Sequence, residues 1–148
     1  MTERELREKI AEQGASLFDR GLTAGSSGTI SVKLPDGMLV TPTNSCLGRL
    51  DPDRISRLDS VGNLLSGDKP SKEAFLHQSM YRARPQEEAI VHLHSTHSVG
   101  VSCLHDINQD DVLPPLTAYY VMRIGKLPLI PYFAPGDMKL ADAPSMRE

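Results

Sequence analysis

The sequence predicts a layered α/β domain with a largely antiparallel or mixed sheet. Two observations support this fold class. An early hairpin pattern joins two strand-like runs through a Pro-Asp-Gly turn, and segments with helical periodicity precede it and recur after it. The chain has 148 residues, an ordinary size for one core, and we find no internal repeat, linker or low-complexity segment. We therefore expect one domain over residues 1–148.

The first half of the chain begins with a helix and continues into the hairpin. Thr2 and Glu5 form a capping box, apolar residues follow at helical spacing, and Gly21 provides a helix stop. Residues 30–34 alternate as a strand does, and residues 38–41 return as the second arm. These patterns predict one helix followed by an antiparallel pair of strands.

The second half alternates helical and strand-like segments. Residues 74–84 have helical spacing, and the apolar run 89–91 continues into His92 as a strand would. Another helix is expected through residues 96–104. The apolar residues 127–132 contain prolines and predict a short strand near a sheet edge.

Composition argues against nucleic-acid and membrane partners. Charged residues make up 24% of the chain, the net charge is −3, and no run carries a single sign. Trp is absent and aromatic residues make up 5%, so base-stacking platforms are not expected. The N-terminus is charged and no apolar run approaches membrane-spanning length. Cys46 and Cys103 lie far apart without CxxC spacing, which indicates reduced thiols in a cytoplasmic protein.

Two histidines at the end of the expected strand are candidate metal ligands. Side chains two apart on a strand point the same way, so His92 and His94 would share a face, about 7 Å apart along the strand. Two imidazoles at that separation can tilt onto one ion at distances of about 2.0–2.1 Å. Taken alone, this pair is equally compatible with hydrogen-bonded histidines of the core or its rim.

An acidic residue at a predicted helix start strengthens the metal hypothesis. Ser71 has the character of a helix N-cap after Pro70, which would put Glu73 in the first helical turn. There a carboxylate is favoured by the helix dipole and lies near the preceding loop. Glu73 taken alone is simply a solvated first-turn acid, so its role depends on the histidines.

Three polar loops have the chemistry of a phosphate site. Residues 25–29, 41–45 and 70–72 offer small side chains, hydroxyls and free amides, and Lys72 adds a positive charge. Each loop alone is more often an ordinary turn. Together with a divalent metal, they indicate a phosphorylated small sugar or sugar acid as the ligand.

The chain resembles the class II aldolase/adducin family over nearly its whole length, and four motifs carry the resemblance in order and spacing. They are Gly28-Thr29, Thr41-Pro42-Thr43-Asn44, Pro70-Ser71-Lys72-Glu73 and His92-Leu93-His94-Ser95. In finer detail the chain is similar to the bacterial 3-oxo-tetronate 4-phosphate decarboxylases. That similarity rests on residues 70–73, 94–98, 114–122 and 128–133.

The resemblance implies a fold and a set of site residues. The fold would be an α/β/α sandwich around a mixed, largely antiparallel central sheet. His92 and His94 would bind Zn2+, with Glu73 as a further ligand or as the proton-transfer group. Tyr119 or Tyr120 would reach the site of a neighbouring subunit in a homotetramer. The substrate phosphate would lie among Gly28, Thr29, Thr43, Asn44, Ser71 and Lys72.

The implied reaction is decarboxylation of a 3-oxo-tetronate 4-phosphate to dihydroxyacetone phosphate and CO2. Loss of CO2 would leave an enediolate whose charge the metal stabilises. Two alternatives stay open at this point. One is a class II aldolase or epimerase acting on a sugar phosphate, and the other is a non-catalytic, adducin-like oligomerisation module.

The histidine count departs from the family pattern. The family's third histidine ligand comes from a later part of the chain, and this sequence has no histidine beyond His105. His77, His97 and His105 match no ligand position, so we expect structural or surface roles for them. We therefore expect the sequence to lack the family's C-terminal portion, as a fragment or a degenerate copy. Weak metal binding, poor activity and a tendency to associate would follow.

Overall fold

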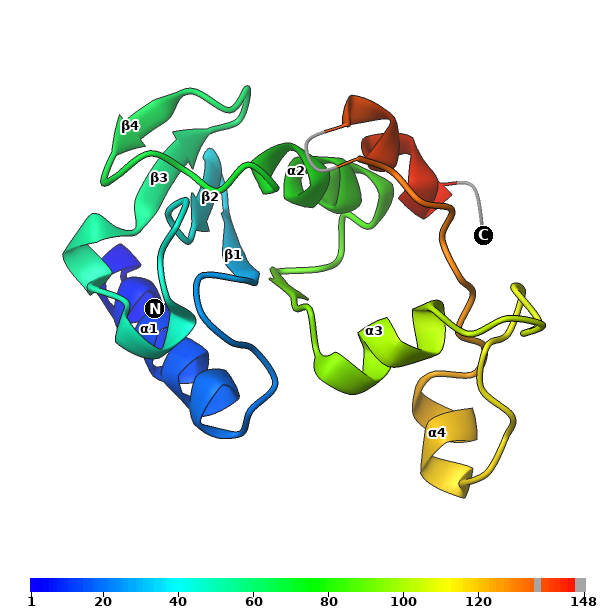
Figure 1. Ribbon diagram of the computed structural model, residues 1–148. Coiled ribbons are helices and arrows are strands. Elements are labelled where there is room, and N and C mark those ends of the chain that lie inside the picture. The colour runs from blue at the N-terminus through cyan, green and yellow to red at the C-terminus, as the bar shows by residue number, and fades with distance from the viewer. Residues whose placement is uncertain (135–136, 146–148) are drawn as a thin grey trace.

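The computed structural model describes residues 1–134 and 137–145, which form an antiparallel sheet with helices on both faces (Figure 1). The strand order is β4-β3-β2-β1-β5. The α/β class is confirmed, and every strand pairing among the described residues is antiparallel. The strands are β1 (Thr29–Leu34), β2 (Gly37–Val40), β3 (Ser56–Asp59), β4 (Leu64–Ser66) and β5 (Ala89–His92).

The helices follow most of the sequence expectations. The capping box of Thr2 and Glu5 is present at the start of the first helix, where the Thr2 hydroxyl accepts from the Glu5 amide. In the part of the chain that the structure describes, no helix is both long and apolar enough to cross a membrane. The α-helices are α1 (Glu3–Asp19), α2 (Ala74–Ala83), α3 (Thr96–Ser102) and α4 (Ala118–Arg123), and the 3-10 helices are η1 (Leu47–Arg49), η2 (Pro52–Arg54) and η3 (Met138–Ser145).

Helix α1 covers one face of the sheet. Ile10 of α1 packs with Ile30 of β1 and Leu39 of β2 in a buried apolar cluster, which Leu47 and Ile55 complete. Alternation along β1 explains the arrangement, because Ile30 faces α1 while Ser31 faces the opposite side and bonds to α2 residues.

Helix α2 covers the other face through a second apolar cluster. Met38 and Val40 of β2 point to this side and pack with Leu58, Tyr81 and Ile90. The 3-10 helix η3 lies against α2, and the Ser79 hydroxyl donates to the Ala141 carbonyl at 2.5 Å (Figure 1). The helices therefore sandwich the sheet, as an α/β/α fold requires.

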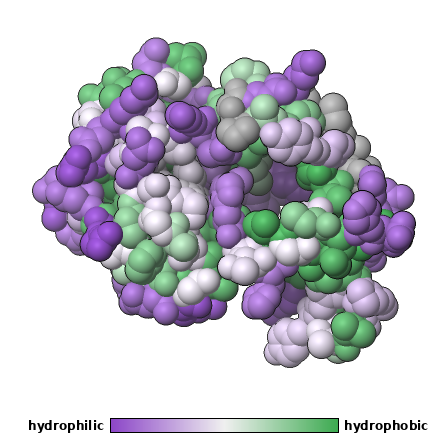
Figure 2. All heavy atoms as spheres, viewed as in Figure 1, coloured by the Kyte–Doolittle hydropathy of each residue, from purple (hydrophilic) through white to green (hydrophobic). Residues whose placement is uncertain are grey.

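Helices α3 and α4 lie apart from the sheet (Figure 1). Neither has a buried residue among those the structure describes. Large side chains are exposed along this part of the chain, including Leu116, Tyr119 and Met122. Figure 2 shows hydrophobic and hydrophilic residues side by side on this part of the surface. Two hydrogen bonds connect α4 and the segment after it to the preceding loop, because Asp111 accepts from the Tyr120 hydroxyl and from the Leu127 amide.

The expected strand over residues 127–132 is wrong. The segment forms no strand, and its amides bond to a loop instead. Leu129 donates to Gln109, and Val112 donates to Leu127. The prolines at 128 and 131 lack amide donors, so the segment has few groups with which to join a sheet.

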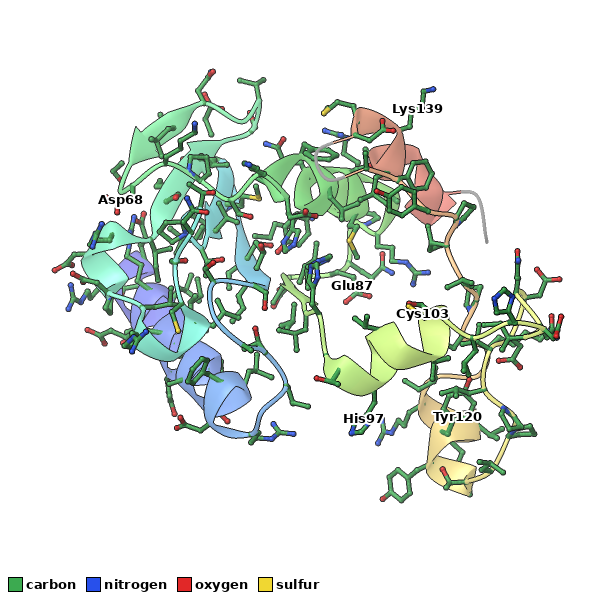
Figure 3. The ribbon with its side chains drawn as sticks, in the orientation of Figure 1. Asp68, Glu87, His97, Cys103, Tyr120 and Lys139 are labelled. Carbon is green, nitrogen blue, oxygen red and sulfur yellow. The ribbon has the colours of Figure 1, made fainter. Side chains whose placement is uncertain are left out.

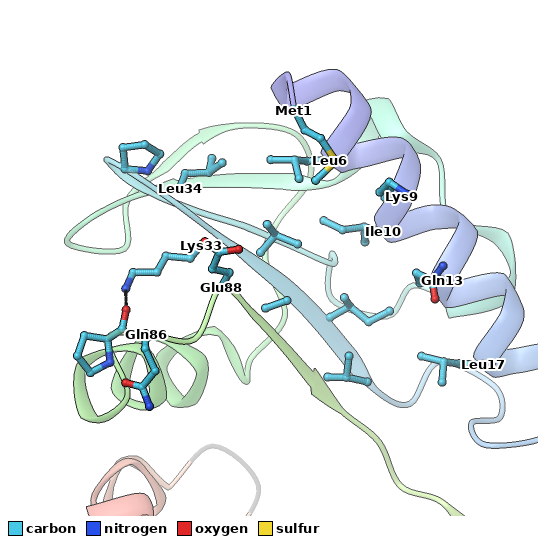
Figure 4. A pocket seen from close by; sticks show the side chains of 16 residues that line it. Met1, Leu6, Lys9, Ile10, Gln13, Leu17, Lys33, Leu34, Gln86 and Glu88 are labelled. Atoms are coloured by element: carbon cyan, nitrogen blue, oxygen red, sulfur yellow. Dashed lines mark hydrogen bonds between the residues drawn. The ribbon is translucent and has the colours of Figure 1, made fainter. Parts of the chain in front are cut away.

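An open apolar groove of about 840 Å³ lies between α1 and the β1–β5 side of the sheet (Figure 4). Leu6, Ile10 and Leu17 line it from α1, and Val32 and Val91 line it from the strands. Val91, on the edge strand β5 of the described sheet, is 52% exposed there. None of the candidate site residues lines this groove, so the groove is not the predicted site.

A buried arginine ties α1 to the loop before β3. The Arg7 guanidinium donates to the Ile55 carbonyl at 2.6 Å and the Pro52 carbonyl at 3.1 Å, and it pairs with Glu3. Arg7 is only 8% exposed, so few waters could replace these partners. The orientation of α1 on the sheet therefore depends on a charged group as well as on apolar packing.

We expect Arg7→Met to lower the free energy of unfolding by about 2–3 kcal/mol, because it leaves buried carbonyls without a donor. Arg4 provides the matched control. It is exposed and pairs with Glu8 and Asp53, so Arg4→Met should cost less than about 1 kcal/mol. Urea unfolding of both variants measures the difference. Equal losses would show that the buried contacts of Arg7 add nothing.

Candidate functional site

One small pocket gathers most of the predicted site residues. Its volume is about 180 Å³, and it lies where three loops meet the end of β5. All six predicted phosphate-binding residues and all three predicted metal-binding residues line it. The full lining is Ser26, Ser27, Gly28, Thr29, Pro42, Thr43, Asn44, Ser71, Lys72, Glu73, His92 and His94.

Backbone pairing brings the loops together. Thr29 pairs with His92 where β1 meets β5, so the first loop opens directly beside the histidines. The second and third loops are joined by two backbone hydrogen bonds, from the Ser71 amide to the Thr41 carbonyl at 3.1 Å and from the Thr43 amide to the Lys69 carbonyl at 2.9 Å. A short hydrogen bond between the Thr29 and Ser71 hydroxyls, 2.8 Å, links the first loop to the third.

Two residues of the pocket adopt positive φ. Gly28 has φ +89, and a Cβ there would lie 3.2 Å from the His92 carbonyl oxygen. Glycine therefore lets the loop backbone approach the end of β5 closely. Asn44 has φ 56, which asparagine tolerates better than most residues. At both positions the positive φ sets the path of the backbone that lines the pocket.

The two candidate metal ligands face each other. Their Nε2 atoms are 2.9 Å apart, with ring centroids at 4.9 Å. The prediction that both lie on one strand is wrong for His94, because β5 ends at His92 and His94 follows it. The predicted alternation is confirmed, since Ile90 is buried while Ala89 and Val91 are exposed. The chain leaving the strand brings the second ring back toward the first.

The start of α2 differs from the expectation. Ser71 is not the N-cap, because the helix begins at Ala74 and Glu73 holds the cap position without a side-chain cap bond. Residues 71–74 form a turn in which the Ala74 amide donates to the Ser71 carbonyl at 3.1 Å. The Ser71 hydroxyl accepts from the Glu73 amide at 3.2 Å. Ser71 therefore shapes the turn that carries Lys72 and Glu73 into the pocket.

Glu73 influences His92 electrostatically. Burial lowers the pKa of His92, the Glu73 carboxylate opposes that effect, and His94 adds to it. The net lowering favours a neutral imidazole at pH 7, which is the form that binds metal. The Oε2 atom of Glu73 is buried and has no hydrogen-bond partner among the described residues.

The donor set fits zinc in part. Two nitrogens that bind one zinc ion tetrahedrally at about 2.0–2.1 Å lie roughly 3.3 Å apart. The His92 and His94 nitrogens, 2.9 Å apart, would need to separate by only a few tenths of an ångström. The orphaned oxygen of Glu73 is a further donor in the same pocket. Across residues 1–134 and 137–145, however, no three His, Cys, Asp or Glu side chains are grouped closely enough to hold a metal ion.

The tyrosines lie elsewhere. Tyr119 and Tyr120 are on α4, away from the sheet, and neither lines the pocket of its own chain (Figure 3). Tyr119 is 78% exposed. The Tyr120 hydroxyl donates to Asp111, and loss of solvation together with the Asp111 carboxylate raises the pKa of Tyr120. A role in a neighbouring subunit's site stays a prediction. His97 on α3 is also outside the pocket (Figure 3).

Sequence reasoning missed the setting of His77. This residue is completely buried between α2 and the sheet, with its ring centroid 6.5 Å from that of His92. Burial, together with the nearby His92, lowers the pKa of His77 to about 4, so its ring is neutral at pH 7. Its spacing of four residues from Glu73 was the available signal.

Comparisons with known proteins match this architecture. Residues 8–147 match the class II aldolase and adducin N-terminal domain family. The chain is 50% identical to the 3-oxo-tetronate 4-phosphate decarboxylase of Escherichia coli K12 over 140 residues, covering 94% of this chain and 66% of that relative. It is 38% identical over 133 residues to the L-fuculose phosphate aldolase of Methanocaldococcus jannaschii, covering 89% and 70% of the two chains.

A solved structure agrees with the sequence comparisons. YgbL of Escherichia coli, described as an aldolase, epimerase or decarboxylase, superposes with a TM-score of 0.90 at 48% identity, covering 95% of this chain and 68% of that one. The chain spans a little under two thirds of the length of the E. coli decarboxylase. The family match over residues 8–147 and the 50% identity show that this chain belongs to the class II aldolase and adducin family.

Proposed function

We propose that the pocket belongs to a zinc-dependent decarboxylase that converts a 3-oxo-tetronate 4-phosphate to dihydroxyacetone phosphate and CO2. One observation carries the proposal. A single small pocket joins two facing imidazoles, a carboxylate with a buried free oxygen, and a wall of hydroxyls, loop backbone and one lysine. The 50% identity to the E. coli decarboxylase supports this substrate over other sugar phosphates.

His92 and His94 would hold the metal through their Nε2 atoms, with Glu73 beside them. When bound, the metal would polarise the substrate's 2-hydroxyl and 3-keto oxygens and stabilise the negative charge that spreads over C2 and C3 as the C1–C2 bond breaks. Glu73 would then move the proton that C2 needs to become the hydroxymethyl carbon of dihydroxyacetone phosphate.

The loop residues that line the pocket would bind the phosphate. Lys72 supplies a positive charge, and Ser71, Thr43 and Asn44 supply hydroxyl and amide groups around it. With the phosphate end of the substrate fixed there, its other end would extend toward the histidines that line the same pocket. The proposal also includes a homotetramer, in which Tyr119 or Tyr120 would reach the pocket of a neighbouring subunit, and a location in the cytoplasm.

An aldolase is the second candidate, because the 38% identical relative from M. jannaschii is an L-fuculose phosphate aldolase. Retro-aldol cleavage needs the same stabilisation of charge next to a ketone, so the same pocket residues would serve it. A non-catalytic module would have no use for the facing imidazoles.

Substrate choice is tested by turnover of the zinc-supplemented chain. A coupled assay for dihydroxyacetone phosphate should give a higher kcat/KM with 3-oxo-tetronate 4-phosphate than with L-fuculose 1-phosphate. Release of CO2 in step with dihydroxyacetone phosphate identifies decarboxylation. A preference for the fuculose substrate would instead favour the aldolase.

Metal binding is tested by His92→Ala. Removing one of the two facing nitrogens should weaken zinc binding by more than the roughly 10–100-fold loss typical of outer-shell changes. The fold should survive, because His92 lies at the end of an edge strand. Competition with a chromophoric chelator measures the affinity. His97→Ala is the control, since His97 is outside the pocket, and equal zinc affinity in both variants would contradict the site.

Phosphate binding is tested by Lys72→Ala. Loss of this charge should raise the KM for a phosphorylated substrate about tenfold, equivalent to roughly 1.4 kcal/mol. Lys69→Ala removes the same charge three residues away, outside the pocket, and should leave the KM nearly unchanged. If both variants raise the KM equally, the increase reflects the overall loss of positive charge, and the phosphate binds elsewhere.

A further inference from the structure

The outer edge of β5 carries backbone groups that point away from the sheet. In an antiparallel ladder, only every second pair of facing residues exchanges its backbone hydrogen bonds. The Lys33 amide donates to the Glu88 carbonyl at 2.8 Å, so Glu88 and, two residues on, Ile90 turn their backbone groups toward β1. Ala89 and Val91 turn theirs away from β1, where the described part of the chain places no further strand.

The apolar groove between α1 and the sheet opens along this same edge (Figure 4). Ala89 and Val91 line it from β5, and both are exposed. Leu6 and Leu17 of α1 point toward the strands across the groove (Figure 4). Folded proteins usually cover a free strand edge and a large apolar surface, because both favour unspecific association. Here the two features lie together, so a single added element could cover both.

The longer relatives have additional chain that could supply this element. The match covers 66% of the E. coli K12 decarboxylase, so about a third of that protein lies outside it. YgbL superposes on 95% of this chain with a TM-score of 0.90, and the superposed part is 68% of YgbL. The sandwich that carries the groove is therefore shared with proteins that have a further third of their length to pack.

A second copy of the chain fits the groove less well. The strand β5 (Ala89–His92) has four residues, so two copies joined edge to edge would share few backbone hydrogen bonds. Such a pair would also bring two open grooves together without filling either one. A separate segment can bond to the edge and place its own side chains in the groove.

We propose that the β5 edge and the groove bind a polypeptide segment from the third of the E. coli decarboxylase that lies outside the match. The segment would add a strand beside β5 and bond to the backbone of Ala89 and Val91. Its apolar side chains on the α1 side would fill the groove. In strand addition, backbone hydrogen bonds supply affinity and alternate side chains supply specificity. This docking goes beyond the proposed function and needs neither a metal nor a substrate.

Binding of a separately produced polypeptide tests the docking. The probe is the unmatched third of the E. coli K12 decarboxylase, added to the full 148-residue chain. Hydrogen exchange followed by NMR should show the Ala89 and Val91 amides exchanging at least about tenfold more slowly when the probe is bound. The amides of β4 (Leu64–Ser66) are the internal control, since β4 lies at the opposite edge of the sheet and its exchange should not change.

Substitutions at the edge separate the groove side chains from the backbone. Val91→Glu puts a charge into the groove and should weaken binding of the probe at least about tenfold. Val61→Glu is the matched control, because Val61 is 78% exposed and does not line the groove. Ala89→Pro removes an outward amide without removing a bond to β1, and it should also weaken binding. This variant keeps the test open if Val91→Glu folds poorly.

Four results would overturn the proposed docking. The probe does not bind, it binds without protecting the Ala89 and Val91 amides, or it binds Val91→Glu and Val61→Glu equally well. The fourth is a dimer of the chain alone, seen by sedimentation, in which the same two amides are protected, because the edge would then belong to a second copy. A chain that binds the probe as expected but turns over no substrate would reject the proposed function and leave the docking intact.

Discussion

The antiparallel pairing of β5 with β1 is the constraint on which the site depends. It sets Thr29 opposite His92, so the loop before β1 and the chain after β5 emerge at the same point. Ser71 then bonds to Thr29, which brings the start of α2 to that point as well. A shift of this register by one residue would turn His92 to the other face of the sheet and separate it from Glu73.

The pairing also explains the polar layer between the sheet and α2. Ser31 lies on the α2 face of β1, between residues that face α1, and it reaches both His77 and Tyr81. An apolar residue at this position would pack well but would leave both partners without a bond. The core thus carries hydrogen-bonded polar groups close to the pocket, since the His77 ring centroid lies 6.5 Å from that of His92.

Local sequence signals predicted the first helix and the hairpin, and the family resemblance predicted which residues line the pocket. The Thr2 capping box and the turn between β1 and β2 depend on adjacent residues, so their patterns are legible without the fold. The end of β5 could not be predicted in this way, because it depends on where the partner strand β1 begins and not on the residues near His94. The strand predicted over residues 127–132 was wrong for the same reason, because a strand forms only where a partner strand offers an edge to pair with. The buried hydrogen bond of His77 was not predicted, because its partner Ser31 lies 46 positions away in the chain.

The central claim is that one pocket binds both a metal ion and a phosphate. Crystals of the chain grown with zinc and inorganic phosphate test it most directly, through anomalous scattering at the zinc absorption edge. The account predicts a zinc peak bonded to His92 and His94, with phosphate held by Ser71 and Lys72 across the same pocket. Zinc bound at Cys103 or His105, or phosphate outside the pocket, would contradict it.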